Sequence, residues 1–511
     1  DSSVGAIVAE IGQCNSRLGY AGEDYPRSLF RSNVAVSRNN NNNNHDDDED
    51  SDPSPIEKIN YDFFTRPING DNDDGWAPSN PIDGTTGIMY DGQSQANRSD
   101  WLDMLPMFIN HGYSSALCTS PADHPLMLVE RSYNPPPLRQ DTLECLFETL
   151  NVPATFLARD AVMACYACGR ATSTVVDVGY GGTVVTPVFE GYVETRGIVR
   201  SPIGGEQMDQ LVIQHLDTLY QEKKGTVECF QPIYQLKKRF VDKRSEGIHY
   251  LARMDVARIC RESGSGAAIG DVQHAPKAPF ELPDGTVVDV SATQRFAVAN
   301  LLFGKDDDSV QRRQLATEEM QSKLSEILSN IGTGTSVHTA KVGGTKEQNN
   351  GPYSASASVG ITQRRTQQAV NKKRVFSNPQ LQKACQPYLQ TMADQITASP
   401  ISAMVCDSAF ACDRDQQAQL LGNVVVAGGG ACIGPTDHAF TDKLREDVEA
   451  IIHQHTPGWR VKVLSPNLRE RSVCSWLGAS ILASLGTFHD MWISRTEYDE
   501  WGPAIVNRKC P

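Results

Sequence analysis

The sequence predicts an α/β protein built from two related halves that face each other across a shared cleft. Two hairpin sequences, one near the N-terminus and one further along the chain, each place a carboxylate and glycine after a strand-like apolar run. A third glycine turn follows another apolar run in the second half of the sequence. Strand-like and helix-like segments alternate between these turns, which is typical of α/β architecture. The repeated hairpin indicates an internal duplication, in which each half offers one hairpin to the cleft.

The clearer hairpin runs from Thr174 to Pro187. Its β-branched residues favour strands, and the glycines of its turn (Gly179, Gly181 and Gly182) permit the positive φ angles of tight turns. Because glycine has no Cβ, such a turn can bring backbone N–H groups within reach of phosphate oxygens. Asp177, just before the turn, is then placed to hold a hydrated divalent cation. An ordinary glycine-rich hairpin is the alternative interpretation.

The first hairpin repeats this pattern near the N-terminus, where Glu10 ends an apolar run and Gly12 follows. The third turn comes after the apolar run 423–427 and precedes a helix expected from about Ala439. This turn suits the base or ribose end of a nucleotide.

Composition restricts the function classes. A chain of 511 residues can bury a large core and is expected to divide into more than one domain. The excess of 62 acidic over 47 basic residues argues against a DNA-coating surface and favours basic partners such as histones. No apolar run reaches the length of a membrane span, and no secretory signal opens the chain. Because the sequence begins at Asp1 rather than Met, we expect that a few N-terminal residues are missing.

The 13 cysteines are scattered, and their odd number favours reduced thiols. Cys165 and Cys168 form a close pair in an expected helix. A zinc site would need two further ligands, so we interpret this pair as core cysteines.

The first half is expected at 1–170, with a low-complexity insert at about 39–58. The insert contains an asparagine run followed by acidic residues, which cannot bury enough apolar surface to offset the entropy of ordering. It is either a solvated loop or an acidic tether for histone tails. Apolar spacing predicts helices at 101–109, 142–150 and 161–169 and a buried strand at 126–129.

The second half is expected at 171–427, and the chain then returns to the first half at 428–511. A helix is predicted from Met208 to Tyr220. A flexible insert is expected at about 304–375, and within it one helix face is predicted from Leu315, Met320, Leu324, Ile327 and Leu328. The basic cluster at 372–374 is either a nuclear import signal or an ordinary solvated cluster.

Several segments are similar to the actin family, and the similarity covers most of the chain outside the two inserts. These segments are 19–27, 281–285, 476–488, 491–494, 497–500 and 508–510. The divergent loops and residues 197–203 most resemble the nuclear actin-related members that serve in chromatin complexes. The resemblance implies the fold shared by actin, sugar kinases and heat-shock-chaperone ATPases, with two α/β halves around a nucleotide cleft.

The resemblance also implies ATP and Mg²⁺ as ligands, with Glu10 and Asp177 acting on the metal mainly through water. The residues expected to bind the nucleotide are Gly12, Gln13, Cys14, Asn15, Arg17, Asp177, Gly179, Tyr180, Gly181, Gly182, Thr183, Gly205, Gly428, Gly429 and Gly430. Glu10 stands where the family has an aspartate, and Arg17 replaces a phosphate-reaching lysine. Gln13 and Cys14 replace a Ser-Gly pair. Near the base, Ser472 takes the place of a contacting lysine, for which Arg471 is a candidate substitute. Weak nucleotide binding or an empty cleft therefore stays an alternative.

The resemblance implies that the hydrolytic side chains are lost. Asp160 stands where the family has a glutamine that positions the attacking water. Tyr180 replaces an aspartate and Val184 a histidine, and valine can neither accept nor relay a proton. We therefore expect no catalytic residues, although hydrolysis by another route stays open.

The function implied is that of a nuclear, non-catalytic scaffold subunit of chromatin-remodelling and histone-acetyltransferase complexes, with roles in transcription and DNA repair. The expected partners are nuclear actin, a helical segment of a remodelling ATPase or acetyltransferase scaffold, and possible direct contacts with histones. Neither a membrane nor a specific DNA sequence is an expected partner. A filament-forming cytoskeletal ATPase is the alternative, and a sugar kinase or chaperone ATPase is a remote one.

Overall fold

The computed structural model describes residues 5–32, 34–37, 56–59, 76–79, 101–232, 246–270, 276–332, 387–388, 390–433 and 436–511. Most of the predicted Asn/Asp insert lies outside these residues, as does the part of the second predicted insert after residue 332, including the basic cluster at 372–374.

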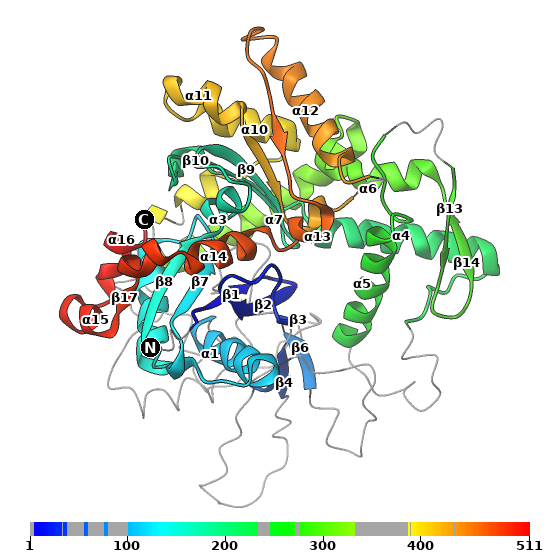
Figure 1. Ribbon diagram of the computed structural model, residues 1–511. Helices are drawn as coiled ribbons and strands as arrows, with labels where there is room; N and C mark the ends of the chain where they lie inside the picture. The colour runs from blue at the N-terminus through cyan, green and yellow to red at the C-terminus, as the bar shows by residue number, and fades with distance from the viewer. Residues whose placement is uncertain are drawn as a thin grey trace, which may run out of the picture.

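The first half is organised around a six-stranded sheet (Figure 1). Its strand order is β17 (Ile493–Ser494), β8 (Ala154–Arg159), β7 (Leu126–Glu130), β1 (Ile7–Ile11), β2 (Asn15–Tyr20) and β3 (Ser28–Arg31). The hairpin strands β1 and β2 are antiparallel, while β7 runs parallel to β1 on its other side. The predicted first hairpin is therefore confirmed.

The second sheet repeats this arrangement. Its order is β11 (Tyr192–Val193), β10 (Thr183–Phe189), β9 (Ser173–Val178), β15 (Val424–Ala427) and β16 (Val463–Leu464), with β12 (Val199–Ser201) also paired to β10. Here β9 and β10 form the antiparallel hairpin, and β15 runs parallel to β9. In both sheets, the first hairpin strand thus lies between its antiparallel partner and a parallel strand. This shared order agrees with the predicted duplication.

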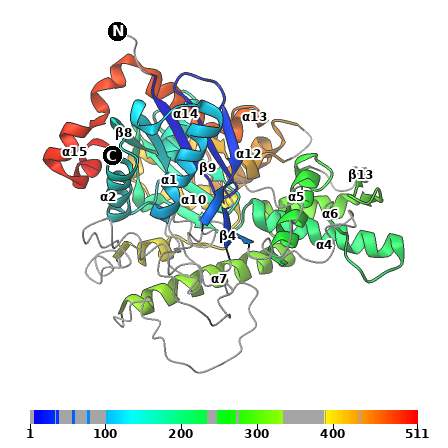
Figure 2. The same cartoon turned by 90° about the horizontal axis from the view of Figure 1, so that it is seen from below.

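Helices cover these sheets, and smaller elements lie beside them (Figures 1 and 2). The helices are α1 (Trp101–Gly112), α2 (Pro136–Glu144), α3 (Asp160–Ala167), α4 (Gly205–Lys224), α5 (Glu246–Glu262), α6 (Ala292–Phe303), α7 (Asp307–Gly332), α10 (Ile401–Phe410), α11 (Arg414–Leu421), α12 (Ala439–Ile452), α13 (Leu468–Arg471), α14 (Cys474–Ser484), α15 (Arg495–Trp501) and α16 (Val506–Lys509). A hairpin of β13 (Ala278–Glu281) and β14 (Val287–Val290) and a small sheet of β4 (Val34–Ser37), β5 (Ile56–Ile59) and β6 (Trp76–Ser79) complete the strands. Short π or 3-10 turns occur at η2 (Tyr113–Leu117), η3 (Pro121–Asp123), η4 (Cys145–Thr149), η5 (Thr195–Gly197), η7 (Gly429–Ala431), η8 (Gly486–Met491) and η9 (Pro503–Ile505).

The predicted helices are present, but several have different ends. The helix predicted at 101–109 continues to Gly112 in spite of Pro106. The helix predicted at 142–150 begins earlier, at Pro136, because proline fits the first turn of a helix, and it widens to a π turn after Glu144. The helix predicted from Met208 begins at Gly205.

The first part of the second predicted insert is the long helix α7 rather than an irregular loop (Figure 2). Met320 and Leu324 are buried against Ile396, as their predicted helix face requires. Leu315 was assigned to the same face, and this assignment is wrong because its side chain is 59% exposed. Met320 follows Leu315 by five positions, and at 3.6 residues per turn this spacing points the two side chains in different directions.

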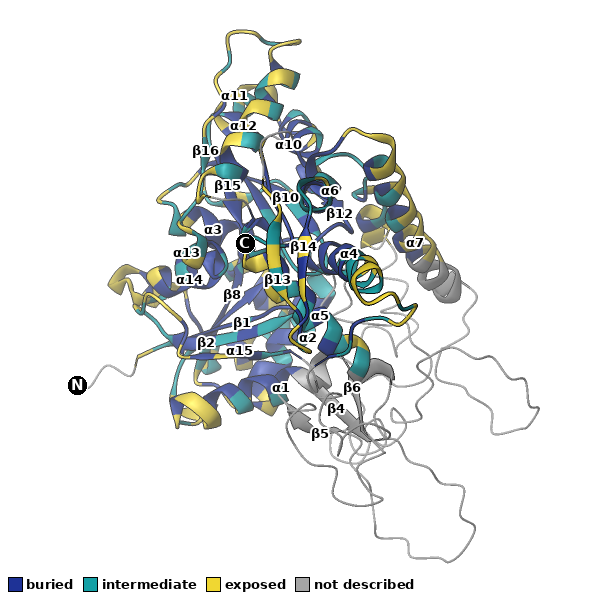
Figure 3. Cartoon of the chain, turned by 90° about the vertical axis from the view of Figure 1, so that its right-hand side faces the viewer, coloured by how far each residue is buried: buried dark blue, intermediate teal, exposed yellow. Residues whose placement is uncertain are grey.

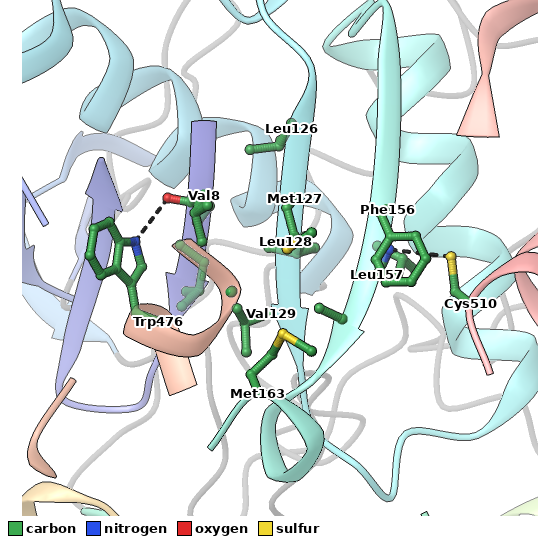
Figure 4. Packing of buried hydrophobic residues seen from close by; sticks show 14 of the residues in the cluster. Val8, Leu126, Met127, Leu128, Val129, Phe156, Leu157, Met163, Trp476 and Cys510 are labelled. Atoms are coloured by element: carbon green, nitrogen blue, oxygen red, sulfur yellow. Dashed lines mark hydrogen bonds between the residues drawn. The ribbon is translucent and has the colours of Figure 1, made fainter. Parts of the chain in front are cut away.

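The chain returns to the first sheet later than the predicted residue 428. Helix α12 and strand β16 still belong to the second half, because Phe440, Leu444 and Val461 lie in the core of the second sheet. The return comes with α14. Its Trp476 indole Nε1 donates to the Val8 carbonyl of β1 at 3.1 Å, and the Leu157 N–H lies 3.4 Å from Cys510 Sγ (Figure 4). The C-terminal segment thus completes the core of the first half.

Burial is concentrated in the central strands of both sheets and in the helices against them, while α11 and much of α7 face solvent (Figure 3). Within the parts of the chain that the structure describes, no helix is long and apolar enough to span a membrane.

Candidate functional site

The two hairpins turn in the same way. The Gly12 N–H donates to the Asn15 carbonyl at 3.0 Å, and the Gly179 N–H donates to the Gly182 carbonyl at 2.9 Å. In each case, the turn begins two residues after the strand-end carboxylate. The predicted turn residues therefore occupy equivalent places in the two halves.

The triple-glycine turn lies directly against the second hairpin. Ala427 pairs with Asp177 in the parallel register of β15 and β9. At Gly428, where φ is +90°, an added Cβ would lie 2.3 Å from the Val178 carbonyl oxygen and 2.4 Å from Asp177 Oδ1. Only glycine allows this approach. The structure thus brings the third predicted turn to the carboxylate of the second.

Helix α4 begins beneath the second turn. The N–H groups of Gly205 and Glu206 donate to the carbonyls of Gly179 and Tyr180 at 3.0 and 2.8 Å. The buried Thr183 hydroxyl donates to the Ile203 carbonyl at 2.7 Å. These donors, two of them on residues predicted to bind nucleotide, therefore hold the turn in place.

Two arginines that the sequence analysis missed lie at the first turn. Arg31 of β3 and Arg258 of α5 approach the Cys14 sulfur to 3.0 and 3.3 Å through their guanidinium groups. Both arginines also form ion pairs with Asp255. Gln13 Nε2 lies 3.5 Å from Glu206 Oε2, which links the first turn to the second half.

The predicted phosphate-reaching arginine is paired within its own hairpin. Glu10 and Arg17 face each other in the register of β1 and β2, and Arg17 Nη1 lies 3.2 Å from Glu10 Oε2. Both side chains are about 85% buried, since their exposed fractions are 15% and 14%. Glu10 therefore partly neutralises the positive charge of Arg17.

Arg131, which was not predicted as a site residue, connects the carboxylates of Asp160 and Asp177. Its Nη1 atom lies 3.0 Å from Asp177 Oδ2 and 3.2 Å from Asp160 Oδ2. The sequence held one indication that Arg131 belongs to the site, because Arg131 follows the predicted strand 126–129 by two residues. In α/β sheets, ligand sites form at the carboxyl ends of parallel strands.

Asp160 begins helix α3 and is saturated with hydrogen bonds. Its Oδ1 atom accepts from the Ser132 N–H at 2.9 Å, from the Ser132 hydroxyl at 2.5 Å and from the Ala161 N–H at 2.7 Å. Its Oδ2 atom faces Arg131. The side chain is buried. This carboxylate is therefore fixed in place by the end of β7 and its own helix.

Burial raises the pKa values of two acidic groups at the site. It raises the pKa of Asp177 to about 6, Arg131 opposes this rise, and the charges of Asp160 and Glu10 add to it. Burial likewise raises the pKa of the Tyr180 phenol, which keeps the phenol protonated. The pKa of Arg131 itself stays above its usual value, because Tyr133 and the surrounding carboxylates outweigh the effect of burial.

The arrangement does not fit a divalent cation. The predicted metal residues, Glu10 and Asp177, each already face a guanidinium group. Among the described residues, no group of three or more His, Cys, Asp or Glu side chains is arranged to hold a metal ion, and this includes the pair Cys165 and Cys168. A cation between Glu10 and Asp177 would lie beside two arginines of like charge.

Arg471 is not available as the substitute for the base-contacting lysine. It is 1% exposed, and its guanidinium group donates to the carbonyls of Ala431 and Asp437 at 2.9 and 2.6 Å and to the Ser465 hydroxyl at 2.6 Å. Arg471 also accepts the Gly428 N–H through its own carbonyl at 3.0 Å. Arg471 therefore holds the triple-glycine turn in place through hydrogen bonds to Gly428 and Ala431.

Comparison with known proteins agrees with this geometry. The family described as Actin matches residues 1–511. Among curated proteins, actin-related protein 4 of rice (Oryza sativa subsp. indica) is 28% identical, with 99% of each chain covered. Actin-related protein 4 of Arabidopsis thaliana is also 28% identical over 99% of each chain, and that of Schizosaccharomyces pombe is 27% identical over 99% of this chain and 98% of its own. With duplicated hairpins, a triple-glycine turn against the second of them and a family match over its whole length, the chain belongs to the actin family.

Proposed function

We propose that this chain is a non-catalytic actin-related protein that binds ATP without significant hydrolysis. We further propose that it works in the nucleus as a scaffold subunit of chromatin-remodelling and histone-acetyltransferase complexes. The similarity to actin-related protein 4 of plants and fungi over nearly the whole chain supports the choice within the family.

The non-catalytic assignment rests on the hydrogen bonds that already occupy the Asp160 carboxylate. Hydrolysis needs a water held in line with the γ-phosphate and a group that takes its proton. Both Asp160 oxygens already have partners, so this carboxylate has little capacity left to orient a water. Val184 lies opposite Asp177 in the hairpin register and offers no polar atom.

The glycine turns support nucleotide binding. Proteins of the actin family generally bind ATP with Mg²⁺. In this chain, the triple-glycine turn lies against the second hairpin turn, and Gln13 of the first turn lies 3.5 Å from Glu206 at the start of α4. Four arginines place guanidinium N–H donors around the two hairpin turns: Arg17, Arg31, Arg131 and Arg258. These features favour a polyphosphate ligand.

The first prediction is that purified full-length chain is stabilised by ATP but releases no phosphate at actin-like rates. Loss of a positioned general base typically lowers a rate by on the order of 10² to 10⁴. Bound ATP then raises the melting temperature by mass action. Thermal unfolding and a phosphate-release assay over hours, with actin in parallel, measure the two effects. Turnover equal to that of actin would contradict the non-catalytic assignment.

The partner assignment rests on chemistry as well as similarity. Apolar side chains are exposed along the C-terminal segment, among them Ile481, Leu485, Met491 and Trp501. They suit a partner helix with an apolar face, such as a segment of a remodelling ATPase or acetyltransferase scaffold. The net charge of −15 suits contact with histones. Nuclear actin is proposed as a further partner.

Purification from nuclei tests this assignment. A tagged full-length chain is expected to copurify with actin and with the subunits of a remodelling or acetyltransferase complex. Ile481→Ser, which changes an exposed side chain, is expected to reduce this association, while the exposed and distant Val227→Ser serves as its control. Recovery with cytoskeletal filaments alone would favour the alternative function.

A further inference from the structure

We propose that this chain binds the polyphosphate of its nucleotide without a divalent cation, because Arg131 supplies the positive charge between the carboxylates of Asp160 and Asp177. The inference rests on the proposed ATP-binding function and concerns the same site. It follows from the misfit between the side chains present and the metal that the family generally uses with ATP.

The backbone fixes the place of Arg131. Strand β7 runs parallel to β1, with Val129 paired to Glu10, and Arg131 follows two residues later. Its guanidinium group therefore emerges at the edge of the sheet where the first hairpin turns. From there it reaches Asp177 of β9 and Asp160 of α3, so that one cation joins elements of both halves.

The guanidinium groups already paired with the carboxylates disfavour a metal and can donate to phosphate. The carboxylates of Glu10, Asp160 and Asp177 face the guanidinium groups of Arg17 and Arg131. A guanidinium group cannot give up its proton in a protein, so its charge cannot be withdrawn to admit Mg²⁺. Guanidinium groups do bind phosphate oxygens through paired N–H donors.

Two more guanidinium groups lie at the first hairpin turn. Arg31 and Arg258 both meet the Cys14 sulfur in the first turn, and they share the single carboxylate Asp255. Four arginines thus lie around the two hairpin turns. Each of them also faces a carboxylate, so they offer N–H donors to phosphate oxygens rather than an excess of positive charge.

The decisive measurement is the affinity of the wild-type full-length chain for ATP, with EDTA and with excess Mg²⁺. We expect the two dissociation constants to agree within about threefold. Binding more than about tenfold tighter with Mg²⁺ would overturn the inference and leave the proposed ATP binding intact. Absence of ATP binding under both conditions would overturn the inference together with the ATP-binding part of the proposed function.

Arginine variants separate a binding role from a merely structural ion pair. Arg131→Ala is expected to weaken ATP binding in EDTA by about 10- to 100-fold, and Mg²⁺ is expected to restore part of this loss because Asp160 and Asp177 are then free of their cation. Arg131→Lys keeps the charge and is expected to stay independent of Mg²⁺. Arg495→Ala, which removes ion pairs far along the chain at Asp499 and Glu148, is the control and is expected to bind ATP as the wild type does.

Mg²⁺ alone gives a readout that needs no nucleotide. We expect it to leave the melting temperature of the wild-type chain unchanged and to raise that of Arg131→Ala. If both Arg131 variants lost ATP binding equally and Mg²⁺ restored neither, the ion pair would be structural and the inference overturned.

Discussion

At the scale of single residues, buried ion pairs fix the surroundings of the two hairpins. Glu130, the last residue of β7, accepts from Arg139 Nε at 2.6 Å, and Arg139 also donates to the Cys510 carbonyl at 2.5 Å. In the second half, Asp209 of α4 accepts from Arg261 Nε of α5 at 2.6 Å. Loss of one partner would leave a buried charge uncompensated, which is strongly destabilising. The strand end that carries Arg131 is thereby anchored to the C-terminal segment.

His215 is expected to make stability fall in mild acid. Burial on α4 lowers the pKa of His215 to about 4, and Arg312 of α7 lowers it further while Asp308 partly opposes this. The unfolded chain then binds the proton first, near pH 6.5, so stability decreases as the pH falls from about 6.5 to 4. After allowance for partial solvent screening, we expect a loss on the order of 1 kcal/mol between pH 7 and 5.

Denaturation of His215→Gln at both pH values measures this contribution. The variant is expected to lose less stability than the wild-type chain on acidification, while the exposed His489→Gln behaves as the wild type. An equal loss in wild type and His215→Gln would show that other groups carry the pH dependence.

At the scale of elements, the contact between α14 and α3 holds the C-terminal segment on the first half. Gly478 of α14 lies so close to α3 that an added Cβ would be 1.8 Å from the Met163 carbonyl oxygen. Trp476, two residues earlier on the same helix, is fully buried against β1 (Figure 4). Small residues at such a crossing set the distance between the two helices.

Gly478→Ala is therefore expected to destabilise the chain even though alanine is the better helix former. The methyl group meets backbone rather than a flexible side chain, so relief requires the helices to move apart, at a cost of about 1–3 kcal/mol or more. Gly486→Ala is the matched control, because nothing lies within 4 Å of the added Cβ there. Thermal unfolding compares the two, and equal midpoints would contradict the packing argument.

At the scale of the whole molecule, the two halves share part of one core. The apolar cluster around the first sheet continues into the second through Val175 and Val425. The second half has a core of its own around α4, α6 and α10. Net charge is −15, so copies of the chain repel one another.

We expect the purified chain to stay monomeric under conditions that polymerise actin. Self-repulsion opposes assembly, and the two charged or polar inserts interrupt loops that resemble filament contacts of the family. High-speed sedimentation with actin as the positive control tests this. A pellet of regular filaments in electron micrographs would favour the cytoskeletal alternative.

Local pattern was sufficient for much of the fold. The hairpins, the strand 126–129 and the helix from Ala439 are each specified by neighbours in sequence, and all are present. Ends of helices were less predictable. Pro136 lies outside the helix predicted at 142–150, and only its place at the first turn of α2 shows that it belongs to the helix.

The parts of the site that consist of glycine turns were predictable from the sequence. Sequence alone indicated the three turns and the carboxylates of the two hairpins. It did not indicate that Arg471 is buried behind the triple-glycine turn, because that depends on carbonyls of Ala431 and Asp437. Nor did it reveal that the Thr183 hydroxyl is taken by Ile203.

The sequence by itself determined the family, the duplicated α/β plan and the glycine turns, since each follows from short-range pattern or from similarity along the chain. Only the tertiary structure decided how the charges are paired. Arg131, Asp160 and Asp177 come from a strand end, a helix start and a different sheet, and their contacts form only when both halves are folded together. Charge pairing depends on distances of a few ångströms, which the spacing of residues along the chain does not set.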